Sequence, residues 1–171
     1  MPAFTNRRRP TGVALLLVLA ASCLLATACG SAPDQSAVKF VNERKSDAER
    51  TQHAVGEARA ALAALSNPPT VGQLLHLRTT ARFARERINE VRAGLPTFEA
   101  AEEELPIAES EAGTGSNELN DAMGELVIYA RHPRAKTLAR YQVDIAQGVA
   151  RWDESMREMW RLARQPNPPL M

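Results

Sequence analysis

The chain has little cysteine, and both copies lie near its start. Cys23 and Cys29 are the two cysteines among 171 residues. Residues 30–171 therefore have no thiol that could pair, attack a substrate or bind a metal. A disulfide, a cysteine nucleophile and a cysteine metal site are excluded there, so a domain in this stretch must be stabilised by packing.

An excess of charge of one sign is also missing. The chain has 21 Lys plus Arg against 20 Asp plus Glu. Removing residues 1–28 would take away Arg7, Arg8 and Arg9 and no acidic residue, which leaves 18 basic against 20 acidic side chains and a formal charge of −2. Such a domain lacks the basic surface that nucleic acid requires, so we expect no nucleic-acid partner.

Histidine is scarce, and its surroundings do not fit a metal site. Carboxylate-bridged metal bundles need a Glu three positions before a His on each of two helices. Arg50, Gln73 and Tyr129 stand three positions before the histidines, His53, His76 and His132. Glu49 and His53 could share a helix face, but a lone pair of this kind is typical of a solvated contact. We expect no metal and no other cofactor.

No motif for catalysis is visible. The sequence has no serine in a nucleophile-elbow context and no glycine-rich phosphate loop, and its few Asp residues are scattered. General acid and base catalysis needs titratable groups that converge, and none can be placed. We therefore predict that the chain is not an enzyme and name no catalytic residue.

The first thirty residues form a basic and then apolar leader. Arg7, Arg8 and Arg9 are followed by an uncharged run over residues 10–28, and small residues surround Cys29 in the sequence Ala-Thr-Ala-Cys-Gly-Ser. A basic segment followed by an apolar one is typical of an export signal.

These residues resemble the lipobox of bacterial lipoproteins. In that family a cysteine preceded by small residues receives a diacylglyceryl group and becomes the mature N-terminus. The resemblance implies that residues 1–28 are a cleaved signal peptide and that Cys29 is the lipidation site. It also implies anchoring at the extracytoplasmic face of the cell membrane, with residues 29–36 as a short tether. Two acyl chains suffice for stable anchoring.

The leader leaves alternatives open. Ala26 stands three places before Cys29, where the family usually has Leu, and Cys23 is a second candidate cysteine. An uncleaved membrane-spanning anchor, a plain secreted form and export by a twin-arginine route are the other outcomes. The small residues before Cys29 favour cleavage and lipidation there.

Apolar residues spaced three and four apart predict four helices and no strand after the tether. The predicted segments are about 36–65, 70–92, 117–131 and 133–163. Ser66-Asn67-Pro68-Pro69 ends the first, and Gly94 and Pro96 end the second. Ser116 or Asn117 should cap the third, after a Gly113–Ser116 turn, and Pro133 suits the first position of the fourth.

The other segments are predicted as connections. Residues 97–112 hold six Glu and no basic residue, with one possible helical stretch over 97–105. They could dock a cation or a basic partner, form a solvated acidic loop, or pair with basic helices of the same chain. Those basic helices could instead face anionic lipid headgroups. Residues 165–171, rich in proline, are expected to be a disordered tail.

Short turns between helices predict an all-α, four-helix-bundle-like antiparallel domain over residues 37–164. An apolar cluster is formed by Trp152, Met156, Met159 and Trp160, and it is core, a pocket for an apolar ligand or a surface that receives a partner helix. Trp160 lies off the apolar face and is expected to be exposed. Arg44 and Thr51 stand at apolar-face positions, which predicts that the first helix is half-exposed near the membrane. The predicted function is a lipid-anchored envelope module that binds an envelope protein or serves a structural role. The alternative is a lipoprotein that binds a small apolar molecule or lipid.

Overall fold

Four helices make up most of the described chain. The computed structural model describes residues 32–93 and 104–171, so the leader with Cys23 and Cys29, the first three residues of the tether, Gly94 and Pro96 lie outside it. The helices are α2 (Gln35–Ala63), α3 (Val71–Arg92), α4 (Glu104–Arg131) and α5 (Ala135–Leu162), and these described ranges contain no strand. The predicted all-α class is confirmed.

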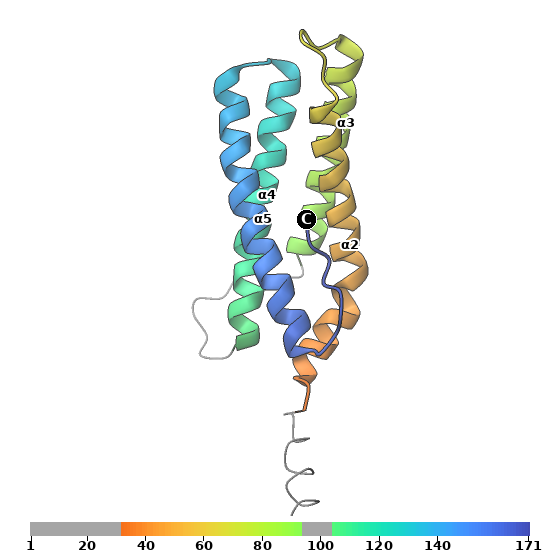
Figure 1. Cartoon of the computed structure of the whole chain (residues 1–171), viewed down its shortest axis with the longest axis vertical. Helices are drawn as coiled ribbons and strands as arrows, with labels where there is room; N and C mark the ends of the chain where they lie inside the picture. The colour runs from red at the N-terminus through yellow and green to blue at the C-terminus, as the bar shows by residue number, and fades with distance from the viewer. Residues whose placement is uncertain (1–31, 94–103) are drawn as a thin grey trace, which may run out of the picture. The chain divides into compact units, whose positions relative to one another are not determined.

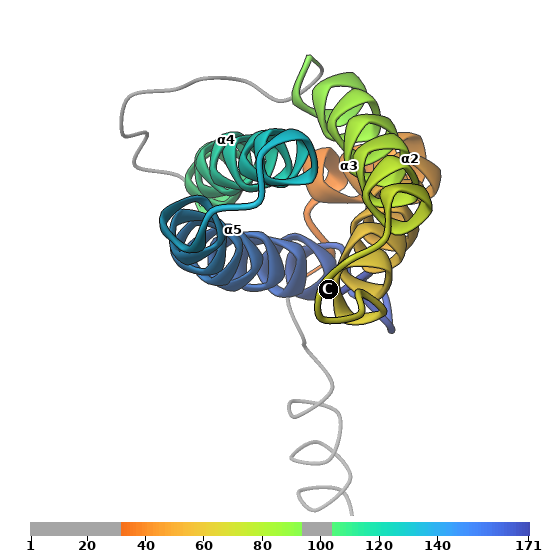
Figure 2. The same cartoon turned by 90° about the horizontal axis from the view of Figure 1, so that it is seen from above.

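The helices form an antiparallel bundle. In residues 33–171 each helix runs opposite to the one before it, as Figure 1 shows, and α2 packs on α3, α3 on α4 and α4 on α5. Figure 2, from above, shows the fourth side of the bundle, between α2 and α5. These two helices have far fewer direct contacts with each other than the other neighbours have. The bundle is therefore fully packed on three sides.

Side-chain caps define the beginnings of α2 and α3. Asp34 accepts a hydrogen bond from the Ala37 backbone N–H at 2.9 Å, so α2 begins at Gln35, two residues before the predicted domain boundary. Thr70 and Gln73 form a capping box at the start of α3. The Gln73 amide also donates to the Ala64 carbonyl at 2.9 Å, which fastens the turn to the end of α2. The turn falls where the sequence predicts it.

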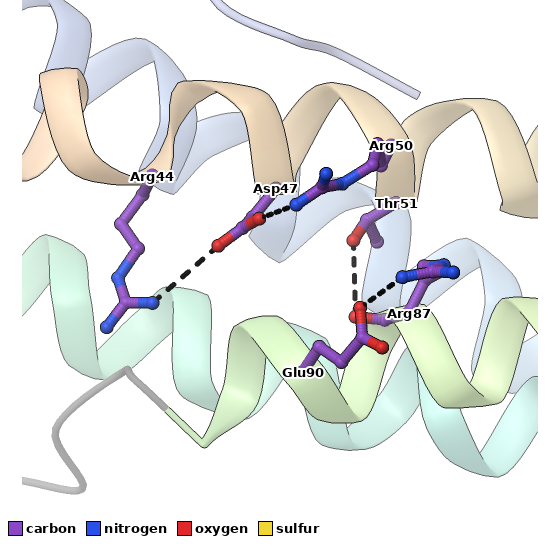
Figure 3. A network of polar contacts seen from close by, with 6 residues as sticks. All are labelled: Arg44, Asp47, Arg50, Thr51, Arg87 and Glu90. Carbon is purple, nitrogen blue, oxygen red and sulfur yellow. Dashed lines mark hydrogen bonds and ion pairs between the residues drawn. The ribbon is translucent and has the colours of Figure 1, made fainter.

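Polar residues are accommodated between α2 and α3 (Figure 3). Thr51 is fully buried, and its hydroxyl lies 3.5 Å from the Arg87 carbonyl of α3. Arg44 is half-buried and pairs with Asp47 at 3.7 Å. The expected half-exposure therefore applies to Arg44, whereas the Thr51 hydroxyl is satisfied by the neighbouring backbone.

Helix α4 is longer than the sequence predicts. It runs without a break from Glu104, so Gly113–Ser116 is helical and neither Ser116 nor Asn117 is its N-cap. The end of the expected acidic connection is therefore the first turns of this helix. Ser116 is buried, and its hydroxyl donates to the Ala112 carbonyl at 2.7 Å.

The glycines in this stretch serve helix packing. A Cβ on Gly115 would lie 2.9 Å from the Trp152 backbone nitrogen, and a Cβ on Gly148 would lie 2.8 Å from the Leu119 backbone nitrogen. The backbones of α4 and α5 thus approach so closely that only glycine fits at these two positions. Small residues that permit close helix approach here resemble a turn in sequence composition, which explains the wrong prediction.

The start of α5 also differs from the prediction. Arg134 is its N-cap and Ala135 its first residue, so Pro133 precedes the cap instead of occupying the first helical position. Pro133 still prevents α4 from continuing, because it lacks the N–H that the next helical hydrogen bond would need.

The core is filled by side chains from all four helices. Those less than 2% exposed include Val41 and Val55 of α2, Leu77 and Ile88 of α3, Leu119, Met123 and Leu126 of α4, and Trp152, Met156, Met159 and Trp160 of α5. Alanines line much of α2, and this permits close approach of the neighbouring helices.

Candidate functional site

The side of the bundle between α2 and α5 holds the C-terminal segment. Residues 165–171, which we call the tail, leave the end of α5 and return between α5 and α2, as the dark blue trace in Figure 1 shows. Pro169 is buried, and Leu170 and Met171 pack against the core. The tail is non-helical as predicted, but the expectation that it is disordered is wrong.

Backbone geometry explains why the chain turns back. Arg164 follows the helix with φ of 53°, the left-handed conformation that commonly ends helices. The Gln165 N–H donates to the Trp160 carbonyl at 2.9 Å and the Arg164 N–H to the Arg161 carbonyl at 3.1 Å, which completes the cap. Asn167 adds a second left-handed residue, with φ of 58°. Together these turns direct residues 168–171 back along α5.

Three side chains hold the tail through its backbone. The Trp152 indole Nε1 donates to the Pro169 carbonyl at 3.3 Å. The Gln52 amide of α2 donates to the Leu170 carbonyl. The Asp153 carboxylate accepts from the Met171 N–H at 2.8 Å. We call the space between α2 and α5 that the tail occupies the groove. Side chains of both helices hydrogen-bond to the extended main chain of the tail there.

A further hollow adjoins Leu170 and Met171 along α2. It has a volume of about 610 Å³, is open to solvent, and is lined on α2 by Glu49, Gln52, His53, Val55, Gly56, Glu57, Arg59 and Ala60. A Cβ on Gly56 would meet no atom within 4 Å, which shows how much space remains there. Small residues, Gly56 and Ala60, and charged residues of both signs, Glu49, Glu57 and Arg59, are among those that line the hollow.

Electrostatics connect α2 and α5 beyond the tail. Burial raises the pKa of the Tyr141 phenol on α5, and the charge of Arg59 on α2 offsets part of that rise in pKa. Arg59 also lines the hollow. The Arg59 charge, carried by α2, thus lowers the pKa of a side chain on α5, the other helix that flanks the tail.

The tryptophan and methionine cluster belongs mainly to the core. Trp152, Met156, Met159 and Trp160 are each at most 1% exposed. The expectation that Trp160 is exposed is wrong, because its side chain belongs to the hydrophobic core that α5 shares with the neighbouring helices. Within the cluster, the Trp152 side chain donates a hydrogen bond to the tail, and the Trp160 backbone carbonyl accepts one from it.

Exposed apolar side chains lie elsewhere than the sequence suggests. Val71, Leu75 and Phe83 of α3 are 85%, 60% and 41% exposed. Their spacing of four and eight residues places them along one face of the helix. Arg87 covers part of this face, with its guanidinium 4.8 Å from the centre of the Phe83 ring.

The histidines do not converge on a site. His53 is exposed and lies 3.7 Å from Glu57, so its partner is not Glu49, and His132 is exposed in the α4–α5 turn. Across residues 32–93 and 104–171, no three His, Cys, Asp or Glu side chains are placed to hold a metal ion.

Acidic residues at the start of α4 pair with α5. Arg151 contacts Glu111 at 2.7 Å and Glu118 at 3.1 Å. The hydrogen bond to Glu111 and then the two carboxylate charges raise the pKa of Arg151. Pairing within the chain is therefore confirmed for Glu111.

Two other glutamates have shifted pKa values. Burial raises the pKa of Glu109, whereas the hydrogen bond from Arg161, at 2.7 Å, lowers the pKa of Glu158. Of the remaining glutamates, Glu99, Glu102 and Glu103 lie outside the described residues.

The lipidation candidate Cys29 is not among the described residues either. Within the part of the chain that the structure covers, none of the helices has the length and apolar character needed to cross a membrane.

The fold thus defines an all-helical bundle whose α2–α5 groove holds an extended segment. Comparison with protein-family models, with curated proteins and with solved structures gave no match. Function is therefore inferred from the residues and their geometry.

The groove between α2 and α5 could not be predicted from the sequence. Gln52 and Asp153 are polar residues in charged helices, and nothing in their spacing marks them as tail contacts. The available signal was the tail composition, in which Pro168-Pro169 precedes Leu170-Met171: an apolar pair after two prolines is unusual for a solvated end.

Proposed function

We propose that this chain is a lipid-anchored, extracytoplasmic module of the bacterial cell envelope that acts by binding another protein. Anchoring rests on the resemblance of the leader to a lipobox and on Cys29. Binding, in place of catalysis, rests on the groove: Trp152, Gln52 and Asp153 hold an extended segment by its backbone. That observation carries the proposal, because recognition of extended segments is a common mode of protein interaction.

The filled core favours this proposal over the binding of a small apolar molecule between the helices. Such a ligand needs an enclosed and largely apolar cavity. The large side chains of α5 that could have lined one, Trp152, Met156, Met159 and Trp160, are packed among their neighbours. The hollow next to the tail is open to solvent.

Anchoring is tested by substituting each leader cysteine. Wild type, Cys29→Ala and, as the matched control, Cys23→Ala are expressed in a bacterial host, fractionated and measured by intact mass. We expect wild type and Cys23→Ala in the membrane fraction with residues 1–28 removed and a diacylglyceryl group on Cys29. We expect Cys29→Ala to lose the modification and leave that fraction.

Other outcomes have defined meanings. Retention of residues 1–28 in all three membrane-bound forms identifies an uncleaved anchor and contradicts lipidation. Cleaved and soluble wild type identifies a secreted protein. Loss of the lipid in Cys23→Ala alone moves the lipidation site to Cys23.

A further inference from the structure

The tail contacts share a pattern that is independent of the tail side chains. Trp152 and Gln52 donate to two successive carbonyls, those of Pro169 and Leu170, and Asp153 accepts from the next N–H, that of Met171. Any extended strand offers these backbone groups. The pattern therefore recognises a main-chain conformation more than a particular sequence.

Proline fits the first part of this pattern. Proline has no backbone N–H, and the hydrogen bond at Pro169 needs none. Trp152 donates to the Pro169 carbonyl, which proline retains. Proline also favours the extended conformation before binding, which lowers the entropy lost on docking. Apolar residues suit the next two positions, because Leu170 and Met171 pack against the core.

The groove can accommodate more than the tail. The hollow of about 610 Å³ adjoins Leu170 and Met171 and continues along α2, where Gly56 leaves open space and Glu57 and Arg59 are among the lining residues. A strand that follows the path of the tail and continues into the hollow would gain contacts that the tail residues do not make.

We propose that the α2–α5 groove is a docking site for an extended, proline-containing segment of a partner protein, and that residues 165–171 occupy this site in the free chain. The proposal rests on the proposed function, in which the module acts by binding a protein, and it names the chemistry of the segment bound. The tail is an intramolecular competitor. Because the tail is attached to α5, its effective concentration at the groove is high. A partner segment must therefore bind the groove more strongly than the tail does, or bind when the tail has left the groove.

The test releases the tail by changing the tail and leaves the groove intact. Leu170→Asp places a carboxylate against the core and near Asp153, so the tail should leave the groove. Gln165→Asp introduces the same charge at an exposed tail position and is the matched control. The full chain is purified in detergent, and the probe is a fluorescent peptide with the sequence of residues 165–171, followed by polarisation.

We expect the Leu170→Asp chain to bind this peptide at least about tenfold more tightly than wild type or Gln165→Asp, because the competitor has been removed. Adding Gln52→Ala should weaken binding several-fold, whereas adding Glu43→Ala, at an exposed position of α2, should not. A peptide with both Pro168 and Pro169 replaced by Gly should bind more weakly.

Three results would overturn the proposal. Equal peptide affinity of Leu170→Asp and wild type means that the groove is no docking site. Equal affinity for the glycine peptide removes the preference for proline. A wild-type dimer that Leu170→Asp dissociates identifies the occupant as the tail of a second copy. Repeating the assay with Cys29→Ala separates the two proposals, since peptide binding does not require the lipid and anchoring does not require the groove.

Discussion

Single glycines differ sharply in their surroundings, and Gly56 and Gly148 mark the extremes. A Cβ on Gly148 would lie 2.8 Å from the Leu119 backbone nitrogen, where no flexible side chain can yield. Gly56 lies within α2 with nothing within 4 Å of an added Cβ. The same substitution should therefore have opposite effects at the two positions.

We predict that Gly148→Ala destabilises the fold by about 3 kcal/mol, since backbone overlap forces α4 and α5 apart. Gly56→Ala should stabilise it by about 0.5–1 kcal/mol, because alanine restricts the unfolded chain and favours helix. Urea unfolding followed by circular dichroism measures both. A Gly148→Ala chain as stable as wild type would contradict the close packing of α4 on α5.

Ionisation of the Glu109 carboxyl group opposes folding. Burial raises its pKa, so the folded state disfavours the carboxylate that the unfolded chain carries at neutral pH. Its contribution to stability is most favourable below the unfolded pKa and is lost as the pH rises through the raised folded pKa.

We predict that Glu109→Gln is more stable than wild type at pH 7 and equally stable at pH 3, where the carboxyl group is protonated in both states. Melting temperatures at the two pH values test this, with Glu86→Gln, at an exposed position of α3, as the control. An equal gain at both pH values would show that ionisation is not the cause.

At the scale of elements, α4 tests how far local sequence determines a helix. Gly113 to Ser116 has the composition of a turn, yet the segment is helical. Thr114 is exposed, and its hydroxyl donates to the Ser110 carbonyl one turn earlier at 3.2 Å. A turn and a helix interior respond differently to proline at this position.

We predict that Thr114→Pro destabilises the chain by about 3 kcal/mol or more, because proline removes a backbone hydrogen bond and collides with the preceding turn. Thr114→Ala, the control, should be close to neutral. Thermal unfolding compares the two. Tolerance of proline would instead favour the turn that the sequence suggests.

How much of each element the sequence could predict depends on where its determinants lie. The boundaries of α2 and α3 follow from local signals, Asp34, the Pro68-Pro69 pair and the Thr70–Gln73 capping box, and the prediction is close for both. The beginning of α4 depends on Gly115 fitting against α5, which is a contact between distant residues. The groove contacts likewise join Gln52 to residues 118 positions away. Such pairings cannot be read from periodicity.

At the scale of the whole described unit, the tail adds to the sparse direct contact between α2 and α5. The bundle is well packed on three sides, and the fourth is bridged by hydrogen bonds from α2 and α5 to the tail. Release of the tail would expose Trp152 and the core residues beneath it. In the exchange that we propose, a partner segment that displaces the tail would also change the free energy of unfolding of the bundle.

The backbone hydrogen bond from the Asp34 N–H to the Leu162 carbonyl, at 3.1 Å, joins the first cap of α2 to the last residue of α5. The chain therefore enters the bundle beside the point from which the tail departs. Asp34 stands five positions after Cys29, a reach of at most about 18 Å when fully extended. A lipid on Cys29 would thus confine the root of the tail to a thin layer above the bilayer. An encounter with another membrane-bound protein then becomes a search in two dimensions, in which even weak complementarity finds its target quickly.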